Sequence, residues 1–470
     1  KLPEPFNKTS DELTDFQLNF VFSESDRLDV SGHLGTDRRF ALSFRNRDGE
    51  LSFRRGNMRF GGNSPLLPPR DGLTINGILR QLRLEEWSTL LDEGLTVVPL
   101  SSVFSGADLE IADFSAFNQN LGHTQLAIRQ EAAQWHLDVE SQLVTGTITM
   151  PLDLADRPQI FAEMERLNIS TANVVAVTER DPRRLPGLLL TAEQFSVGQR
   201  RVGVLNADIR ADPLGLKMES FQTESDSFAM EGSGSWFDGN QGPETRLELS
   251  LSSGDIATTL EQLGFDPVTE GAGGDVTLSV HWPDSPSADW AQSISGNLTL
   301  KLEQGSVLNL EPGAGRMMGL MSITALPRRL ALDFRDVFNR GLVFDEINGD
   351  FRIINGNAYT DNLYLTGPVA DIGVVGRTGL GDQDYQQQAV VTAEPGKILP
   401  TMGFLAGPQV GAALLIFTQL FKEPLRGVGR ASYCVTGNWD EPSVERLTPT
   451  ELQRDEICAD LPPIADVATQ

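Results

Sequence analysis

Apolar and polar residues alternate along much of the chain, in short runs that stop at turn residues. In residues 349–379 apolar residues recur two positions apart, and the runs are separated by Asn355-Gly356 and Gly367-Pro368. Because successive side chains of a β-strand point to opposite faces, each run predicts a strand with one apolar and one polar side. The turn pairs predict hairpins between successive strands.

Runs of this kind cover most of the sequence, at residues 27–60, 125–150, 205–237, 245–251, 275–282, 296–302 and 349–379. We expect roughly 25 strands, joined as antiparallel hairpins in one long meander. An open sheet of that size must twist and curl. The predicted fold class is mainly β: a long curled antiparallel β-sheet of the repeating β-groove type, which forms an open hydrophobic groove and carries a few short helices and C-terminal helices.

Two short amphipathic segments interrupt the strand pattern, at residues 83–94 and 253–265. Each predicts a short helix. In the second segment Ser253 or Asp255 is placed to cap the N-terminus, and Gly264 is placed to end the helix.

Two segments nearer the C-terminus are also expected to be helical. Residues 313–341 predict two short helices broken at Pro327, and residues 398–422 contain an uncharged run that is interrupted by Pro400 and Pro408. The uncharged run fits a helical plug or hairpin that contacts a membrane, an ordinary buried helix, or a membrane span. The residues expected to contact a membrane are Leu399, Phe404, Leu405, Leu414, Leu415, Phe417, Leu420 and Phe421.

Composition supports a turn-rich β protein and excludes one class of partner. The 470 residues include 45 Gly and 26 Pro, and the formal net charge is −27. A chain this acidic repels nucleic acid and avoids non-specific adhesion to anionic lipid headgroups. The chain begins at Lys1 with neither an initiator Met nor a signal peptide, so we expect it to be a piece of a longer protein.

No motif in the sequence supports catalysis. The four histidines, His33, His123, His136 and His281, lack metal-ligand spacing and lie in or beside strand-like runs. The stretch GSGSW does not fit a nucleophile elbow, and GAGRMMG has one residue too many for a dinucleotide fingerprint. We therefore predict no metal, no cofactor and no enzymatic activity.

The only two cysteines, Cys434 and Cys458, lie near the C-terminus. Cys434 is in a strand-like run and Cys458 is in the acidic tail. In an oxidising compartment the pair would form a disulfide that fixes the tail to the last strand, and otherwise both would be free thiols.

The apolar side of the predicted sheet requires a covering. Either it packs on itself as a core, or it stays open as a groove, in which case an acyl chain is the natural occupant. The candidate lining residues are Leu216, Met218, Phe228, Met230, Leu247, Leu249, Leu278, Val280, Leu298, Leu300, Phe351, Ile353, Leu363, Leu365, Ile372 and Val374. If the groove is open, replacing Leu365 or Val374 with Asp should block lipid movement while the sheet still folds.

Several stretches of the chain resemble one family. They are DPRRLPGLLLTAEQFSVGQRRVGVL, EGSGSWF, GRMMGLMSITALPRRLALDFRDVFNRGLVFDEINGDFRI, AYTDNLYLTGPVADIGVVGRTGL, LAGPQVGAALLIFTQL and VTGNWDEPSVERL, which all lie between residues 181 and 447. Their order and spacing are similar to those of the AsmA-like family of Gram-negative envelope proteins, in particular its YhdP branch. The resemblance is looser before residue 181.

This resemblance implies a bridge-like lipid transporter. The resemblance implies that members of the family are held in the inner membrane by an N-terminal anchor and cross the periplasm as a β-groove. We expect the anchor to lie outside the piece given by this chain. The implied function is movement of phospholipid between the inner and outer membranes in support of the outer-membrane barrier. The implied partners are phospholipid acyl chains and the two membranes, and a periplasmic location favours the Cys434–Cys458 bond.

The resemblance also suggests a domain division and an alternative function. The expected regions are the N-terminal part of the groove at 1–180, its continuation at 181–310, an AsmA-like C-terminal region at 311–447 with helices at 313–341 and 398–422, and an acidic tail at 448–470. The alternative is a structural or assembly factor of the outer membrane, similar to the TamB relatives, whose sheet edges act on as yet unidentified β proteins of the envelope.

Overall fold

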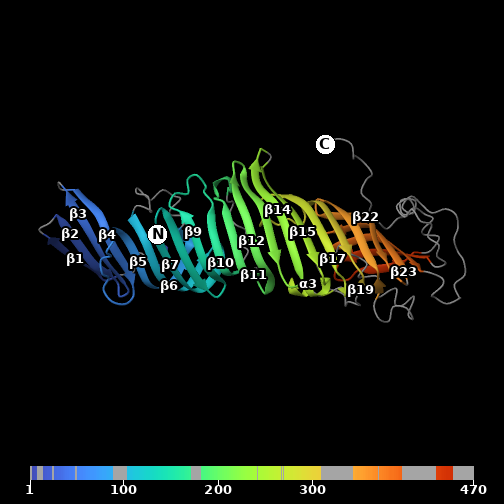
Figure 1. Cartoon of the computed structure of the whole chain (residues 1–470), viewed down its shortest axis with the longest axis horizontal. Helices are drawn as coiled ribbons and strands as arrows, with labels where there is room; N and C mark the ends of the chain where they lie inside the picture. Colours follow the sequence, from blue (N-terminus) through green and yellow to red (C-terminus); the bar gives the residue numbers. More distant parts are fainter. Residues whose placement is uncertain are drawn as a thin grey trace. The chain divides into compact units, whose positions relative to one another are not determined.

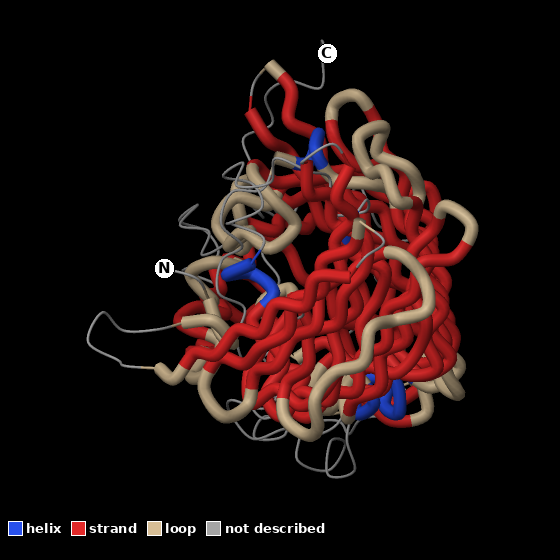
Figure 2. The backbone as a smooth tube through the Cα atoms, turned by 90° about the vertical axis from the view of Figure 1, so that its left-hand side faces the viewer, coloured by secondary structure: helices blue, strands red, loops and turns tan. Residues whose placement is uncertain are grey.

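The computed structural model describes residues 3–7, 14–23, 26–47, 50–87, 103–170, 181–240, 242–265, 267, 269–307, 342–368, 370–393 and 430–447. These residues contain 26 strands and very few helical turns (Figure 2). The mainly β prediction is therefore confirmed, and the structure is consistent with a β-groove. Helices expected at 313–341 and 398–422 lie outside the described residues.

The chain divides into two compact units, which are described separately. The first contains residues 1–198 and 203–211, and the second contains residues 199–202 and 212–470. The strand β12, Arg200–Asp212, contributes residues to both. The region boundaries expected at residues 180, 310 and 447 stay predictions.

The first unit contains eleven strands besides its share of β12 (Figure 1). They are β1 Phe16–Ser23, β2 Arg27–Leu34, β3 Arg38–Arg47, β4 Glu50–Phe60, β5 Gly72–Arg83, β6 Phe104–Ala116, β7 Gln119–Glu131, β8 Gln134–Ser141, β9 Val144–Pro151, β10 Ile160–Ile169 and β11 Leu188–Val197, with a 3-10 turn, η1, at Pro182–Arg184.

Pairing in the first unit is mixed, so the expectation of a purely antiparallel sheet is wrong. Strands β4 and β5, β5 and β6, and β10 and β11 pair in parallel. The strands in each of these pairs are joined by the connections 61–71, 84–103 and 170–187, which are long enough to return the chain to the same end of the sheet. The other neighbours in this unit pair antiparallel, most of them through short turns.

The second unit is antiparallel throughout its described pairings. Its main strands are β13 Gly215–Glu224, β14 Phe228–Gly239, β15 Gly242–Ser253, β17 Gly274–Pro283, β18 Ser295–Leu302, β21 Glu346–Ile354, β22 Asn357–Thr366, β23 Ala370–Gly379, β24 Asp384–Ala393, β25 Arg430–Asn438 and β26 Ser443–Arg446. Three short strands, β16 Thr269–Glu270, β19 Gly305–Val307 and β20 Leu342–Phe344, form a separate small sheet.

The turn between β21 and β22 has the geometry that its sequence predicts. Asn355 and Gly356 have φ values of 46° and 73° and connect the paired residues Ile354 and Asn357. Two successive positive φ angles define the hairpin turn that Asn-Gly favours. Glycine is required at Gly356 for a second reason, because an added Cβ would lie 2.4 Å from the carbonyl oxygen of Ala291.

The one full helix among the described elements is α3, Ile256–Gln262, as the sequence predicts. Asp255 caps it: its carboxylate accepts hydrogen bonds from the backbone N–H groups of Ala257 and Thr258, at 3.0 and 3.3 Å. Gly264 follows the helix with a φ of 77°. Among the described residues, no helix is long and apolar enough to cross a membrane.

Candidate functional site

Apolar residues of the second unit line up across its strands, and the register defines the rows. One row, here called the central row, takes a residue from each of β13, β14, β15, β17, β18 and β21. Its members are Phe221, Gly232, Leu249, Leu278, Leu298 and Phe351. Residues directly opposite each other share one face of a sheet, so the row is a continuous apolar band that runs across the strands.

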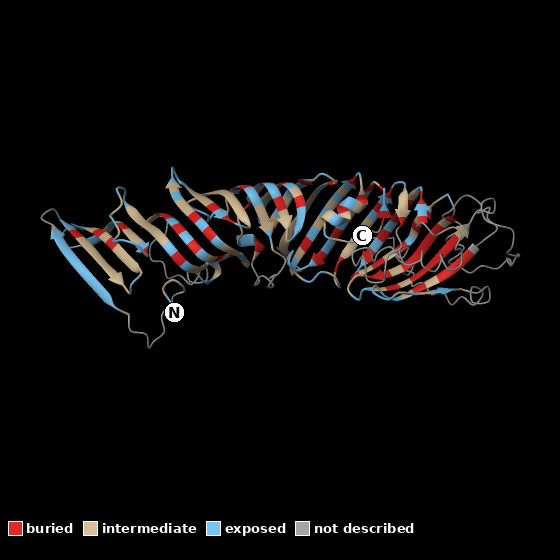
Figure 3. Cartoon of the chain, turned by 90° about the horizontal axis from the view of Figure 1, so that it is seen from below, coloured by how far each residue is buried: buried red, intermediate tan, exposed pale blue. Residues whose placement is uncertain are grey.

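The other face of the same strands is polar. The neighbouring row contains Glu231, Ser250, Thr277, Thr299 and Asp350, and all five are exposed. The hydroxyl of Thr299 donates a 2.7 Å hydrogen bond to Asp350 across the strands. The alternation between the two rows is visible as stripes of differing burial along the strands (Figure 3).

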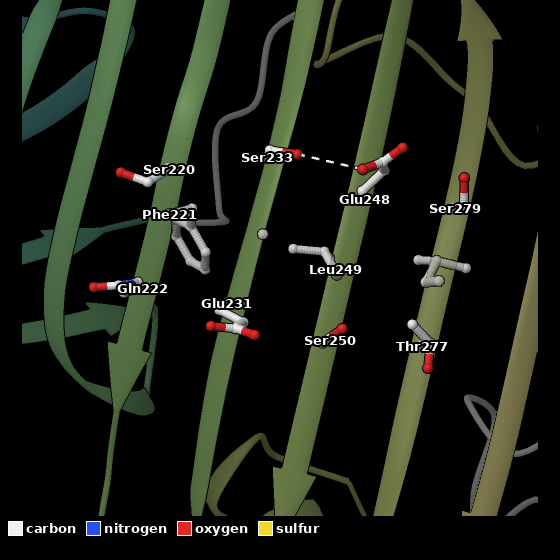
Figure 4. A pocket seen from close by; sticks show the side chains of 12 residues that line it. Ser220, Phe221, Gln222, Glu231, Ser233, Glu248, Leu249, Ser250, Thr277 and Ser279 are labelled. Atoms are coloured by element: carbon white, nitrogen blue, oxygen red, sulfur yellow. Dashed lines mark hydrogen bonds between the residues drawn. The ribbon is translucent and has the colours of Figure 1, made fainter.

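The central row is not sealed. Phe221, Leu249, Leu278 and Leu298 are partly exposed, whereas Phe351 at the end of the row is buried. An open hollow of about 400 Å³ lies against these strands, and most of the residues that line it are polar, among them Glu231, Ser250 and Thr277 of the polar row (Figure 4). The openness of the central row therefore rests on the partial exposure of its own side chains.

Towards β25 the same apolar face is fully packed. A second row, here called the closed row, joins β18 and β21–β25 through Leu302, Ile347, Leu365, Ile372, Val391 and Ala431. None of these side chains is more than 6% exposed. The second unit therefore combines a partly open apolar surface on β13–β18 with a packed core on β21–β25.

The register places all the candidate lining residues predicted from the sequence on this apolar face. They differ in exposure, however. Leu216, Met218, Met230, Leu247, Leu249, Leu278 and Leu298 are partly exposed, whereas Phe228, Val280, Leu300, Phe351, Ile353, Leu363, Leu365, Ile372 and Val374 are buried. Both Leu365 and Val374 are 0% exposed, and an unpaired charge there has no solvation, so we now expect Asp at either position to destabilise the fold.

The prediction from sequence missed Phe221 because of a β-bulge. The pairing shifts between Met218 and Phe221, so that Glu219 and Ser220 together face a single residue of β14. The extra residue reverses the alternation and brings Phe221 to the apolar face with Met218. A simple count of every second residue assigns Phe221 to the polar side.

The first unit has an apolar band of its own, which sequence reasoning did not single out. One row crosses β1–β11 through Leu18, Gly32, Phe40, Met58, Ile75, Ala107, Ile128, Leu137, Ile148, Ala162 and Leu190. Most of these side chains are partly exposed. Closer to one rim the face is covered, where the ring of Phe6 packs edge-on against Phe60 at 5.8 Å and against Trp87 at 6.0 Å.

Other candidate features have the following positions. Cys434 lies on β25 and is disulfide-bonded. Cys458 and the residues of the uncharged run, from Leu399 to Phe421, lie outside the described residues, so the Cys434–Cys458 pairing and the membrane contact stay predictions. The four histidines lie on β2, β7, β8 and β17. Within the described ranges, no three His, Cys, Asp or Glu side chains gather closely enough to hold a metal ion.

Together these features define a class of protein: a mainly β chain whose sheets carry one polar face and one apolar face that is only partly packed. The family model for the YhdP protein matches residues 1–444, so the chain belongs to the YhdP family. The resemblance noted in the sequence is thereby confirmed.

A curated relative extends the comparison. The chain is 23% identical over 398 residues to the intermembrane phospholipid transporter YhdP of Escherichia coli strain K12. The alignment covers 82% of this chain and 31% of that protein, so the chain spans about a third of the relative's length. No solved structure matches the chain.

Proposed function

We propose that this chain is a phospholipid-binding segment of a transporter that moves lipid between the inner and outer membranes of a Gram-negative envelope. The observation that carries the proposal is the central row, an apolar band of partly exposed side chains that crosses six strands. An apolar surface of this kind is unfavourable in water, and each methylene that covers it contributes about 0.8 kcal/mol. The relative in Escherichia coli is named a phospholipid transporter, which supports acyl chains as the molecules that cover this surface.

No bond is made or broken in this function. Acyl chains lie against the apolar rows, while the headgroups remain in water at the rim of the sheet. Because the central row offers apolar residues and no charged group on successive strands, we expect the binding energy to change little along the path, so that a lipid meets no deep trap. The periplasmic location, the contribution to the outer-membrane barrier and the two membranes as partners belong to this proposal.

The test is site-specific photocrosslinking on one strand. A photoreactive amino acid is placed at Leu278 on the apolar face, or at its neighbour Thr277 on the polar face, and the chain is irradiated with vesicles of phosphatidylethanolamine and phosphatidylglycerol. Phospholipid adducts at Leu278 but not at Thr277 are expected. Equal labelling at both positions, or none at Leu278, would refute an acyl-binding face.

One observation favours the alternative, an assembly factor that acts through a sheet edge. Strand β1 pairs only with β2 among the described strands, and its Phe16, Phe20 and Phe22 are 56%, 55% and 79% exposed. An unpaired edge can receive a strand of another protein. A photoreactive residue at Phe22 that captured a protein in the envelope, with no lipid adduct at Leu278, would support this alternative.

A further inference from the structure

The first unit contains a strongly basic stretch in an otherwise acidic protein. Residues 27–83 hold eleven arginines and only five acidic residues, a net charge of +6, whereas the whole chain carries −27. Strands β2–β5 lie within this stretch. The negative net charge of the whole chain therefore does not describe residues 27–83, whose local positive charge attracts anions.

Register places arginines of adjacent strands opposite each other: Arg27 opposite Arg45, and Arg39 opposite Arg59. Arg27 is itself ion-paired with Asp29, and Arg39 donates a hydrogen bond to the carbonyl oxygen of Gly62. Like charges in directly opposed positions destabilise a sheet, so an anion bound beside Arg45 would lower that cost.

One cavity collects groups suited to such an anion. It has a volume of about 380 Å³ and lies where β3, β4, β5, β6 and β7 begin or end, at a rim of the sheet. Its lining includes the cations Arg45 and Arg54, the carboxylate of Asp71, the hydroxyls of Ser52 and Ser105, and the rings of Phe53 and Phe104.

Two β-bulges contribute to this same cavity. Arg54 is the unpaired residue of a bulge between β3 and β4, where Ser43 faces Arg55 and Phe44 faces Phe53. Ser105 is the unpaired residue of a second bulge, between β5 and β6. A bulge redirects a side chain that regular alternation would place elsewhere, so both irregularities serve one site.

The geometry leaves the arginines able to bind. The Nε of Arg54 donates to Asp71 at 2.9 Å, which positions the guanidinium, while its two Nη groups have no hydrogen bond among the described residues. Among the described residues, the side chain of Arg45 makes no ion pair. Gly72, which also lines the cavity, has no room for a side chain. Its φ is 109°, and an added Cβ would lie 2.7 Å from the Cβ atom of Ser105.

We propose that this rim cavity binds the phosphate of a phospholipid headgroup, through Arg45 and Arg54. The inference rests on the proposed function, because Phe53 and Phe104 lie on the apolar face beside the cavity and would meet the first acyl carbons. Planar guanidinium groups bind phosphate through paired hydrogen bonds. Glycerophospholipids share this phosphate whatever their headgroup, so the site recognises the class and not one species.

A native reporter lies beside the cavity. Trp135 is paired with Gln130, which lines the cavity, and its ring lies 5.4 Å from that of Phe104. The experiment titrates the chain with a phospholipid that carries a nitroxide on its headgroup, and follows the quenching of tryptophan fluorescence. Trp135→Phe identifies the part of the signal that comes from this site.

Three comparisons decide the outcome. The double variant Arg45→Gln/Arg54→Gln should bind the labelled phospholipid about tenfold more weakly. Arg246→Gln, which removes an exposed arginine with a similar 2.9 Å carboxylate pair in the second unit, should bind it as the wild type does. The third comparison uses diacylglycerol with matched acyl chains, which has no phosphate. It should bind equally to the wild type, the double variant and Arg246→Gln, and mass spectrometry of the delipidated and reloaded proteins measures this binding.

Each failure has a distinct meaning. Unchanged phospholipid affinity in the double variant, with lipid still bound, overturns the headgroup site and leaves the proposed function intact. Inorganic phosphate that binds the wild type as tightly as the phospholipid does would reassign the cavity to free phosphate. If neither phospholipid nor diacylglycerol binds any variant, the proposed function fails and the headgroup site fails with it.

Discussion

Leu249 lies over Gly232: a Cβ added to Gly232 would come within 2.5 Å of the Cδ2 atom of Leu249. The same Cβ would lie 2.4 Å from the carbonyl oxygen of Glu248. The central row therefore crosses β14 at a position without a side chain. The side chain of Leu249 on β15 occupies the space above Gly232. Gly232 keeps the apolar band close to the backbone at this point.

Gly232→Ala should consequently destabilise the second unit and reduce lipid binding. We expect the free energy of unfolding to fall by about 1–3 kcal/mol, since the backbone of β15 cannot move away without breaking its ladder. Gly239→Ala on the same strand is the control, because nothing lies within 4 Å of its added Cβ. Urea unfolding of the two variants checks the prediction, and equal stabilities would contradict it.

Charged substitutions should separate the open part of the apolar face from the packed part. Leu278→Asp places a carboxylate at a partly exposed position, so we expect a loss of about 1–2 kcal/mol in stability and a loss of bound lipid. Leu365→Asp buries an unpaired charge and should cost about 3–5 kcal/mol or prevent folding. Circular dichroism melts and lipid loading measure both effects.

Thr277→Asp serves as the matched control for Leu278→Asp. Thr277 is the neighbour of Leu278 on β17 and is exposed on the polar face. It should keep wild-type stability and lipid loading. If it lost lipid as Leu278→Asp does, the effect would come from added negative charge and not from the apolar face.

Alkaline pH should destabilise the second unit through its tyrosines. Burial, with a smaller contribution from Asp371, raises the pKa of Tyr364 to about 12, and burial also raises the pKa of Tyr385. An unfolded tyrosine loses its proton near pH 10 while Tyr364 keeps it, so stability is fully present below pH 10 and is lost as pH rises towards 12.

For half-buried Tyr364 this loss should amount to about 1 kcal/mol after allowance for solvent screening. Tyr364→Phe should therefore show a shallower fall in unfolding free energy between pH 9 and pH 12, and absorbance at 295 nm follows the ionisation. The prediction fails if wild type and variant lose stability in parallel over that range.

Reduction should weaken the C-terminal end of the sheet. Cys434 on β25 is disulfide-bonded, and Cys458 is the other cysteine of the chain. Loss of the cross-link should lower the unfolding free energy by about 3 kcal/mol. Thermal melts of wild type with and without reductant should differ, whereas those of Cys434→Ser should not. A non-reduced peptide map that lacked a Cys434–Cys458 peptide would refute the proposed pairing.

Strand positions were predictable from the sequence, because alternation and turn residues act locally. Asn355-Gly356 forms the expected hairpin turn, and Asp255 and Gly264 bound α3 as their residue types indicate. The parallel pairs were not predictable in this way, since the direction of a strand depends on the length and path of a connection that contains few strand signals. The mixed sheet of the first unit is the result.

Bulges and burial also escaped the sequence pattern, for physical reasons. A bulge changes the facing of every later residue in its strand, so Phe221 appears on the wrong side when alternate residues are counted, and Arg54 is left without a partner in the register. Leu278 and Leu365 have the same residue type and the same strand pattern, yet one is partly exposed and the other is 0% exposed. Exposure is decided by what packs above the sheet, which a local pattern does not contain.

The apolar rows run across the sheet, at right angles to the individual strands. The length of a row is therefore set by the number of strands. Each strand adds one residue to a row and about 4.8 Å to its extent. Inserting or deleting a whole hairpin therefore lengthens or shortens a row in steps of roughly 10 Å and leaves the remaining strands in register. If the rows bind lipid as proposed, the gain or loss of hairpins would change the length of the apolar face without requiring a new kind of lipid contact.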